Sequence, residues 1–292
     1  MAGTDRLSWY REATEARLNV ILPPADASPT ELHQAMRYSA LAPGKRLRPA
    51  LAMASAEAFS GQPESALDAG CAAELIHCFS LIHDDLPSID DDDLRRGRPT
   101  CHVKFGEAMA ILAGDALFAL AFEVISECSS DHGLVSQCVR VLSRATGSSG
   151  LVGGEVLDIL SEGGEPDFDL LNVIHRQKTG ALIAASCEMG ALLGGATRQQ
   201  AEKMAQFGMT IGLAFQIADD ILNETGSAEE LGKAVGSDSD RRKLTYPSVI
   251  GIEASQQAAR EMLDQAITFL DSAPGDTSPL RELAGFAIAR NH

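Results

Sequence analysis

Apolar positions along this chain recur at intervals of three and four residues, which is the spacing of α-helices. Several of the predicted helices are apolar on most of their faces, and a helix without a polar face must be buried by its neighbours. The predicted helices cover residues 30–40, 66–83, 106–128, 170–193, 199–222 and 255–270. No convincing alternation of polar and apolar residues and no Asn-Gly hairpin signal predicts a strand.

This pattern predicts an all-α fold, a single large bundle of about ten helices. No stretch has the composition of an interdomain linker. The glycine-rich segments 147–154 and 163–166 are short enough to connect helices. We therefore expect residues 1–292 to form one domain.

Composition and charge exclude some classes of partner. The chain has 24 Lys and Arg against 41 Asp and Glu, a net charge of −17. Nucleic acid and anionic membrane surfaces attract basic faces, so neither is expected as a partner. The longest apolar stretches are interrupted by Asp115 and by Glu188, so no stretch is expected to span a membrane.

The cysteines and the N-terminal segment bear on the compartment. Six cysteines contain no C-x-x-C pair, which in a chain of this length is typical of reduced, buried thiols. The first residues are charged and lack the apolar core of a signal peptide. These features predict a cytoplasmic protein.

The most concentrated chemistry lies in the segment His83–Thr100, HDDLPSIDDDDLRRGRPT. Six acidic residues fall within ten positions at the end of an apolar helix, and Arg95 and Arg96 follow. Acidic runs are more often solvated surfaces, but carboxylates this dense beside a buried helix repel one another unless a cation neutralises them. Mg²⁺ bridges carboxylates to phosphate oxygens, and arginine binds phosphate in a bidentate manner. The segment therefore predicts a site for Mg²⁺ and a phosphorylated substrate.

The spacing of two of these acids requires an irregular helix. Asp84 and Asp90 are six residues apart, which places them about 120° apart around an ideal helix. They can share a face only if the helix is distorted between them. Pro87 supplies a cause, because it cannot donate a hydrogen bond to the carbonyl of His83.

A second acidic segment is FQIADDILN, residues 215–223. Gln216 and Asp220 are four residues apart, as are Asp219 and Asn223, so each pair lies on one helical face. Taken alone, the segment fits the polar stripe of an amphipathic helix as well as it fits a ligand site.

Basic residues are few, and several stand beside glycine or at expected helix ends. They are Lys45, Arg46 and Arg48 in GKRLRP, Lys178 in KTG, Lys233 and Lys243. Each alone would be a surface charge. Together with two acidic segments they indicate an anion that carries more than one phosphate.

The order of these motifs resembles that of the trans-isoprenyl diphosphate synthases (polyprenyl synthetases), and most closely the bacterial farnesyl diphosphate synthases. The resemblance covers essentially the whole chain, through GKRLRP, ELIHCFSLIHDDLPSIDDDDLRRGRPTCHVKFGE, ILAGDAL, HRQKTGAL, AFQIADDIL, LGK, KLTYP and ARNH in family order. It implies an isoprenoid-synthase bundle around a deep central cavity and a homodimer. It also implies head-to-tail condensation of isopentenyl diphosphate with dimethylallyl or geranyl diphosphate, giving farnesyl diphosphate.

The resemblance implies roles for individual residues. Metal ligands would be Asp84, Asp85, Asp90, Asp219 and Asp220, holding three Mg²⁺ ions, with Mn²⁺ as a substitute. The allylic diphosphate would be bound by Arg95, Lys178, Lys233 and Lys243, and isopentenyl diphosphate by Lys45, Arg48, His77 and Arg96. Thr179 and Gln216 would lie near the developing allylic cation. Phe79, five residues before Asp84, would form the floor that limits product length.

Two positions depart from the family pattern. Asn223 stands where the second motif usually ends in a third Asp, and Glu155 follows Gly153-Gly154 where Gln is usual. Asn keeps an acceptor oxygen but loses the charge, whereas Glu155 adds a negative charge near the expected site.

Three alternatives to a farnesyl product remain at this point. A geranylgeranyl diphosphate synthase belongs to the same class and makes a longer product. A terpene cyclase would lack the isopentenyl-binding set Lys45, Arg48 and Arg96. An inactive regulatory subunit would typically lose an aspartate motif, and this chain keeps both.

Overall fold

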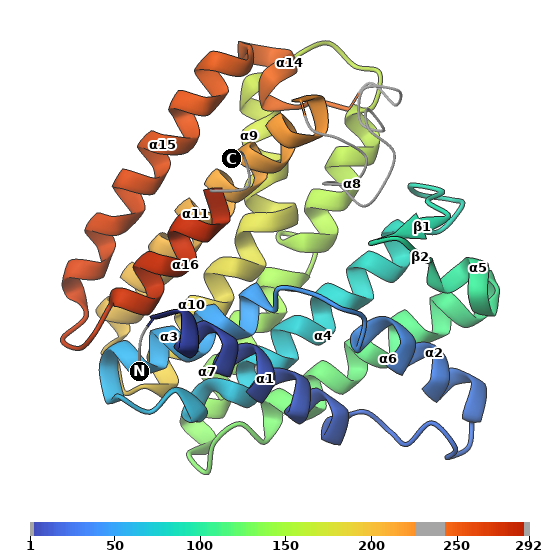
Figure 1. Cartoon of the computed structure of the whole chain (residues 1–292), viewed down its shortest axis with the longest axis horizontal. Helices are drawn as coiled ribbons and strands as arrows, with labels where there is room; N and C mark the ends of the chain where they lie inside the picture. The colour runs from blue at the N-terminus through green and yellow to red at the C-terminus, as the bar shows by residue number, and fades with distance from the viewer. Residues whose placement is uncertain (1–2, 226–242, 289–292) are drawn as a thin grey trace.

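The computed structural model describes residues 3–225 and 243–288 and is all-α, 77% helical (Figure 1). The elements in chain order are α1 (Gly3–Ile21), α2 (Thr30–Ala40), α3 (Leu47–Ser60), η1 (Pro63–Ala66), α4 (Leu67–Asp84), β1 (Leu94–Arg95), β2 (Arg98–Pro99), α5 (Cys101–Phe105), α6 (Glu107–Ser126), α7 (His132–Thr146), α8 (Leu151–Ser161), α9 (Phe168–His175), η2 (Arg176–Gly180), α10 (Ala181–Leu193), α11 (Arg198–Thr225), α14 (Tyr246–Ile250), α15 (Ile252–Phe269), η3 (Leu270–Ser272) and α16 (Ser278–Ile288). The all-α prediction is confirmed.

Helices α4 and α10 occupy the interior of the bundle. α4 packs against α3 and α6, and α10 packs against α3, α7 and α11. α15 and α16 run beside α11 on one side of the molecule, while α1 and α2 lie across the other (Figure 1). Nearly all of Leu182–Leu192 on α10 is buried, as a helix without a polar face requires.

Two helices are long and apolar enough to cross a membrane by length and composition, the stretch Pro63–Asp84 and the helix Glu107–Ser126. Their apolar windows are 67% and 39% buried in the bundle. A buried core helix passes the same test, so neither helix is strong evidence for a membrane span within the described residues.

A short hairpin that the sequence pattern did not predict follows the acidic segment. Leu94 pairs with Pro99 and Arg95 with Arg98. The two turn residues, Arg96 and Gly97, have φ values of 53° and 72°, the left-handed values that a two-residue hairpin turn requires. The strands are only two residues long, too short to produce an alternating pattern.

Candidate active site

The acidic segment folds back on the end of α4. The helix ends at Asp84, and the backbone N–H of Asp90 donates to the carbonyl of Asp84 at 2.8 Å. The carbonyl of His83 accepts from the N–H of Leu86, because Pro87, which has no N–H, cannot donate to it. The helix therefore ends between the two aspartates, rather than continuing in distorted form as predicted. The turn brings Asp90 back beside Asp84.

Arg95 on the hairpin forms an ion pair with Asp85. Its Nε and Nη2 atoms lie 2.7 and 2.6 Å from Asp85 Oδ1, and the Asp85 side chain is only 5% exposed. Burial raises the pKa of Asp85, and the guanidinium opposes that rise. The hairpin thus places Arg95, a predicted diphosphate ligand, against a predicted metal ligand.

The segment that carries Lys178 and Thr179 is a π-helical turn, Arg176–Gly180, between α9 and α10. π-Turns widen the helix locally and are frequent at functional sites. A Cβ atom on Gly154 of α8 would lie 2.3 Å from the backbone nitrogen of Lys178. Only glycine therefore allows α8 to approach this turn closely enough to place its carboxylates around Lys178.

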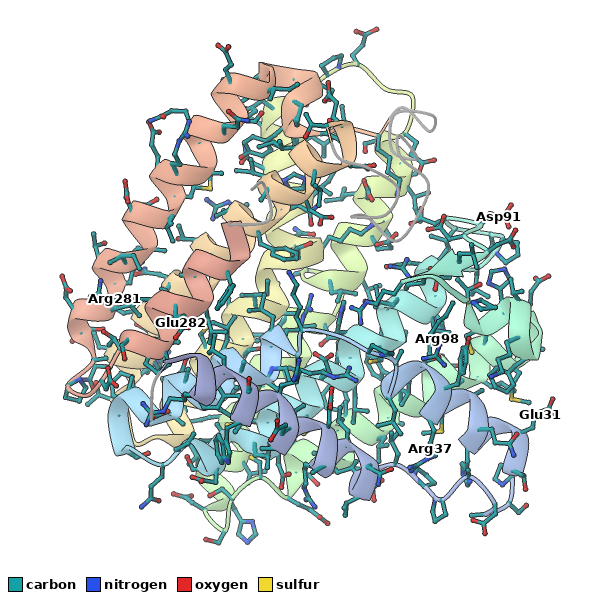
Figure 2. All side chains as sticks on the ribbon, viewed as in Figure 1. Glu31, Arg37, Asp91, Arg98, Arg281 and Glu282 are labelled. Atoms are coloured by element: carbon teal, nitrogen blue, oxygen red, sulfur yellow. The ribbon has the colours of Figure 1, made fainter. Side chains whose placement is uncertain are left out.

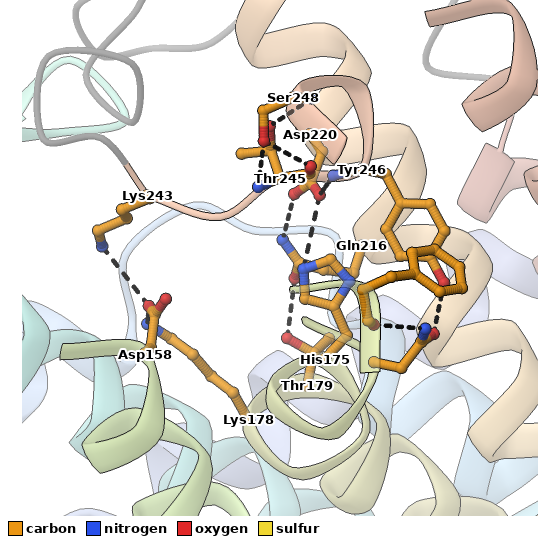
Figure 3. A network of polar contacts seen from close by, with 12 residues as sticks. Asp158, His175, Lys178, Thr179, Gln216, Asp220, Lys243, Thr245, Tyr246 and Ser248 are labelled. Carbon is orange, nitrogen blue, oxygen red and sulfur yellow. Dashed lines mark hydrogen bonds and ion pairs between the residues drawn. The ribbon is translucent and has the colours of Figure 1, made fainter. Parts of the chain in front are cut away.

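Two lysines lie among carboxylates contributed by α8 and by the turn after α4. Figure 3 shows Lys178 and Lys243 on either side of Asp158 of α8. Lys178 Nζ lies 2.7 Å from both Asp158 Oδ2 and Glu155 Oε2. Lys243 Nζ lies 2.8 Å from Asp90 Oδ1 and 3.6 Å from Asp158 Oδ2. Burial opposes the charge of each lysine, but the carboxylates outweigh it and raise the pKa of both Lys178 and Lys243.

The raised pKa of Asp84 favours its neutral form, whereas the raised pKa values of the two lysines favour their charged form. Burial raises the pKa of Asp84 to about 7, with further contributions from Glu155 and Asp90, while Lys178 and Arg95 act against the rise. A carboxyl in this state gains strongly from an added cation.

The residues predicted to lie near the allylic cation come together. Thr179 donates its hydroxyl to Gln216 Oε1 at 2.8 Å, which joins the π-turn to α11. Gln216 Nε2 in turn donates to Asp220 Oδ1 at 3.1 Å. Asp220 is buried, whereas the neighbouring Asp219 is only half-buried.

A cavity of about 60 Å³ lies at the other side of α4, between α2, α4 and the hairpin. Its lining includes His77, Arg95 and Arg96 together with Asp85. Burial and the neighbouring arginines lower the pKa of His77 well below its usual value, so its ring is neutral near pH 7.

The predicted isopentenyl-binding residues converge near this cavity. Arg96 donates to the carbonyl of Pro43 and packs against Gly44. This contact joins the hairpin to the segment that carries Lys45, which is exposed, and Arg48, which is partly buried. Burial lowers the pKa of Arg48, despite Glu74 nearby.

Two further predicted residues are Phe79 and Lys233. Phe79 makes an edge-to-face contact with Phe118 of α6, with ring centroids 5.2 Å apart, and Phe118 also contacts Phe122. Lys233 lies outside the described residues.

Asp158 is the residue that reasoning from sequence missed. It accepts from Lys178 and approaches Lys243, and these two lysines lower its pKa against the effect of burial. The available signal was its position three residues after Glu155, which places both on one face of a helix.

The aspartates fit Mg²⁺ that is shared with a substrate. Among the described residues, no group of three or more His, Cys, Asp and Glu side chains is preassembled to hold a metal. Mg²⁺ sites of this kind usually use one or two carboxylates, water and substrate phosphates rather than an all-protein cage. Asp84, Asp90 and the half-buried Asp219 offer such carboxylates.

Residues 29–280 match the model of the polyprenyl synthetase family. The chain belongs to this family. It is 46% identical to geranylgeranyl pyrophosphate synthase 12, chloroplastic, of Arabidopsis thaliana over 96% of its own length and 79% of the relative's.

Solved structures agree with this membership. An FPP/GFPP synthase from Zymomonas mobilis, crystallised in the apo state, superposes with a TM-score of 0.86 at 35% identity and covers 98% of this chain and 99% of that one. A geranyltransferase from Helicobacter pylori, in complex with magnesium and isoprenyl diphosphate, superposes with a TM-score of 0.84 at 30% identity, covering 97% and 96%. The family is Mg²⁺-dependent.

The predicted cytoplasmic location is contradicted. The Arabidopsis relative and two further geranylgeranyl pyrophosphate synthases of that plant, at 45% identity over 96% of this chain, are chloroplastic enzymes. The error has a physical reason: free thiols indicate a reducing compartment, and they do not distinguish one reducing compartment from another.

Proposed function

We propose that this chain condenses isopentenyl diphosphate head-to-tail with an allylic diphosphate, as a short-chain trans-prenyltransferase. The observation that carries the proposal is the placement of Lys178 and Lys243 between Asp90 on one side and Asp158 and Glu155 on the other. This arrangement offers fixed cations to a diphosphate and carboxylates to its metal ions.

The allylic substrate must first lose its diphosphate. As the C1–O bond breaks, negative charge grows on the leaving group, and Lys178, Lys243 and Arg95 stabilise it. Asp84, Asp85, Asp90 and Asp219 would hold the Mg²⁺ ions, about three as the family resemblance implies, and these ions would supply Lewis-acid stabilisation of the same charge.

The resulting allylic cation needs protection and a partner. Thr179 and Gln216 present oxygen atoms beside it, and the surrounding apolar helices exclude the water that would quench it. Lys45, Arg48, His77 and Arg96 hold isopentenyl diphosphate so that its alkene attacks C1. The proton released from C2 of the attacking unit passes to the freed diphosphate.

For the product, we propose geranylgeranyl diphosphate, because curated relatives at 44–46% identity are geranylgeranyl synthases. Farnesyl diphosphate is the second candidate. Phe79 favours it, since a ring roughly 7.5 Å down α4 from Asp84 would shorten the space for the growing chain.

Incubation of the purified chain with isopentenyl diphosphate, Mg²⁺ and each allylic starter, followed by chromatography of the dephosphorylated products, tests the proposal. A twenty-carbon alcohol supports the first product and a fifteen-carbon alcohol the second. Absence of any prenyl product with every starter would favour an inactive regulatory subunit.

The homodimer also remains a proposal. Ile111 and Leu112 on α6 are 43% and 53% exposed, an apolar surface that a second copy would cover. Sedimentation of the purified chain gives its mass in solution and tests this assembly.

A further inference from the structure

Asp220 has both carboxylate oxygens engaged by groups of the protein (Figure 3). Oδ1 accepts from Gln216 Nε2 at 3.1 Å, and Oδ2 accepts from the backbone N–H of Tyr246 at 2.9 Å. The side chain of Asp220 is 4% exposed. Its neighbour Asp219 is half-buried on the same helix. The two adjacent aspartates therefore have different surroundings.

Tyr246, whose N–H donates to Asp220, is the first residue of α14. Thr245 caps this helix, accepting from the N–H of Ser248, whose hydroxyl accepts from the N–H of Thr245. Lys243 precedes the cap by two residues, and its ammonium contacts Asp90 and Asp158. Because Lys243 is three residues before Tyr246, a hydrogen bond that holds the backbone of Tyr246 in place also restricts the position of the Lys243 ammonium.

His175 of α9 contacts both Tyr246 and Asp220. Its ring stacks on Tyr246 with centroids 5.5 Å apart at an interplanar angle of 15°, and Nε2 lies 3.5 Å from Asp220 Oδ2. The hydroxyl of Tyr246 donates to Asn172 Oδ1 at 2.6 Å, also on α9. Three helices, α9, α11 and α14, thus meet at the Asp220 carboxylate.

We propose that Asp220 is a positioning residue that holds Lys243 at the diphosphate site through Tyr246, and that it is not a magnesium ligand. This departs from the assignment that the family resemblance implied for Asp220. The inference rests on the proposed function, because Lys243 matters only if a diphosphate binds there.

The first test compares Asp220→Ala with the matched variant Asp219→Ala. Calorimetric titration with Mn²⁺ and inorganic diphosphate reports metal binding without turnover. We expect Asp219→Ala to weaken Mn²⁺ binding about tenfold or more, equivalent to about 1.4 kcal/mol, and Asp220→Ala to change it less than about threefold. Equal losses in the two variants would overturn the proposal.

Hydrogen exchange gives a second, independent readout. Asp220→Ala should increase exchange of the peptide covering 243–250, because the N–H of Tyr246 loses its acceptor. Asp219→Ala should leave that peptide protected. Unchanged protection in Asp220→Ala would show that Asp220 does not hold this segment. If Asp220→Ala does not fold, Asp220→Leu, which is close to Asp in size and has no acceptor oxygen, takes its place.

A double-mutant cycle tests whether Asp220 acts through Lys243. Asp220→Ala and Lys243→Ala should each raise the KM for the allylic diphosphate, and the double variant should be no worse than Lys243→Ala alone. Additive effects would contradict the proposal. A wild-type chain without prenyltransferase activity would refute the proposed function, while the titration and exchange results would still decide the role of Asp220.

Discussion

The backbone N–H of Asp90 donates to the carbonyl of Asp84 at 2.8 Å, across the turn that ends α4. Asp91 follows in a left-handed conformation, with φ of 49°, and its side chain points outward at the edge of the molecule (Figure 2). The turn places two carboxylates of the acidic segment together and directs the next one into solvent. The exposed Asp91 can therefore serve as a matched control for substitutions at Asp84.

Asp84→Asn should stabilise the metal-free protein at alkaline pH and abolish turnover. Because the pKa of the Asp84 carboxyl is about 7 in the folded chain and 3.8 for an ordinary aspartate, the folded chain binds more protons than the unfolded chain between these pH values. The free energy of unfolding therefore falls as pH rises through this window, and Asp84→Asn lacks this decrease because Asn does not ionise. Melting in EDTA should show the largest gain near pH 8 and a smaller gain near pH 5.5. Asp91→Asn removes the same charge from the surface, and an equal gain there would contradict this explanation.

Glu155→Gln should shift the acid limb of the rate profile to lower pH. Glu155 raises the pKa of Asp84 and pairs with Lys178, so its neutralisation lets Asp84 ionise at lower pH. We expect a shift of up to about one pH unit in kcat/KM at saturating Mg²⁺. Glu162→Gln, an exposed change beyond the end of α8, is the control. An unmoved acid limb in Glu155→Gln would separate Glu155 from the ionisation of Asp84.

Arg96→Ala and Arg95→Ala should affect different substrates. Arg96 lies against Gly44 beside the predicted isopentenyl set, whereas Arg95 pairs with Asp85. We expect about a tenfold rise in the KM for isopentenyl diphosphate in the first variant and for the allylic diphosphate in the second. Arg198→Ala removes an exposed ion pair with Glu202 on α11 and should change neither KM. Equal effects of Arg95→Ala and Arg96→Ala on both substrates would indicate one shared anion site.

Phe79→Ala should lengthen the product relative to wild type, whichever product wild type makes. The change removes the ring that packs on Phe118 and opens space below Asp84. Loss of a fully buried Phe typically costs about 3–5 kcal/mol and Phe79 is partly buried, so a smaller loss is expected and melting must be measured first. Phe122→Ala, which contacts Phe118 from the next turn of α6, is the control for general loosening. An unchanged product from a folded Phe79→Ala variant would show that Phe79 is not the floor.

Much of the fold was predictable from local pattern. Residues 30–40 were predicted as a helix and form α2 with the same bounds, and the predicted helix 199–222 lies within α11. The predicted helix 170–193 is in fact α9, a π-turn and α10. Apolar periodicity could not show the π-turn, because the extra residue is accommodated by packing against Gly154 and α8.

The class of chemistry could be read from the residue types alone, because an acid-rich segment, a second acidic helix and scarce, well-placed cations have few uses other than binding metal and diphosphate. The partner of each charged side chain became known from the folded structure. Asp85 meets Arg95 through a hairpin, Lys178 meets Asp158 across 20 residues, and Asp220 meets Tyr246 across 26. Residue types along a chain report what a side chain can bind. Its actual partners depend on segments that folding brings together, and burial decides how strongly each pair interacts.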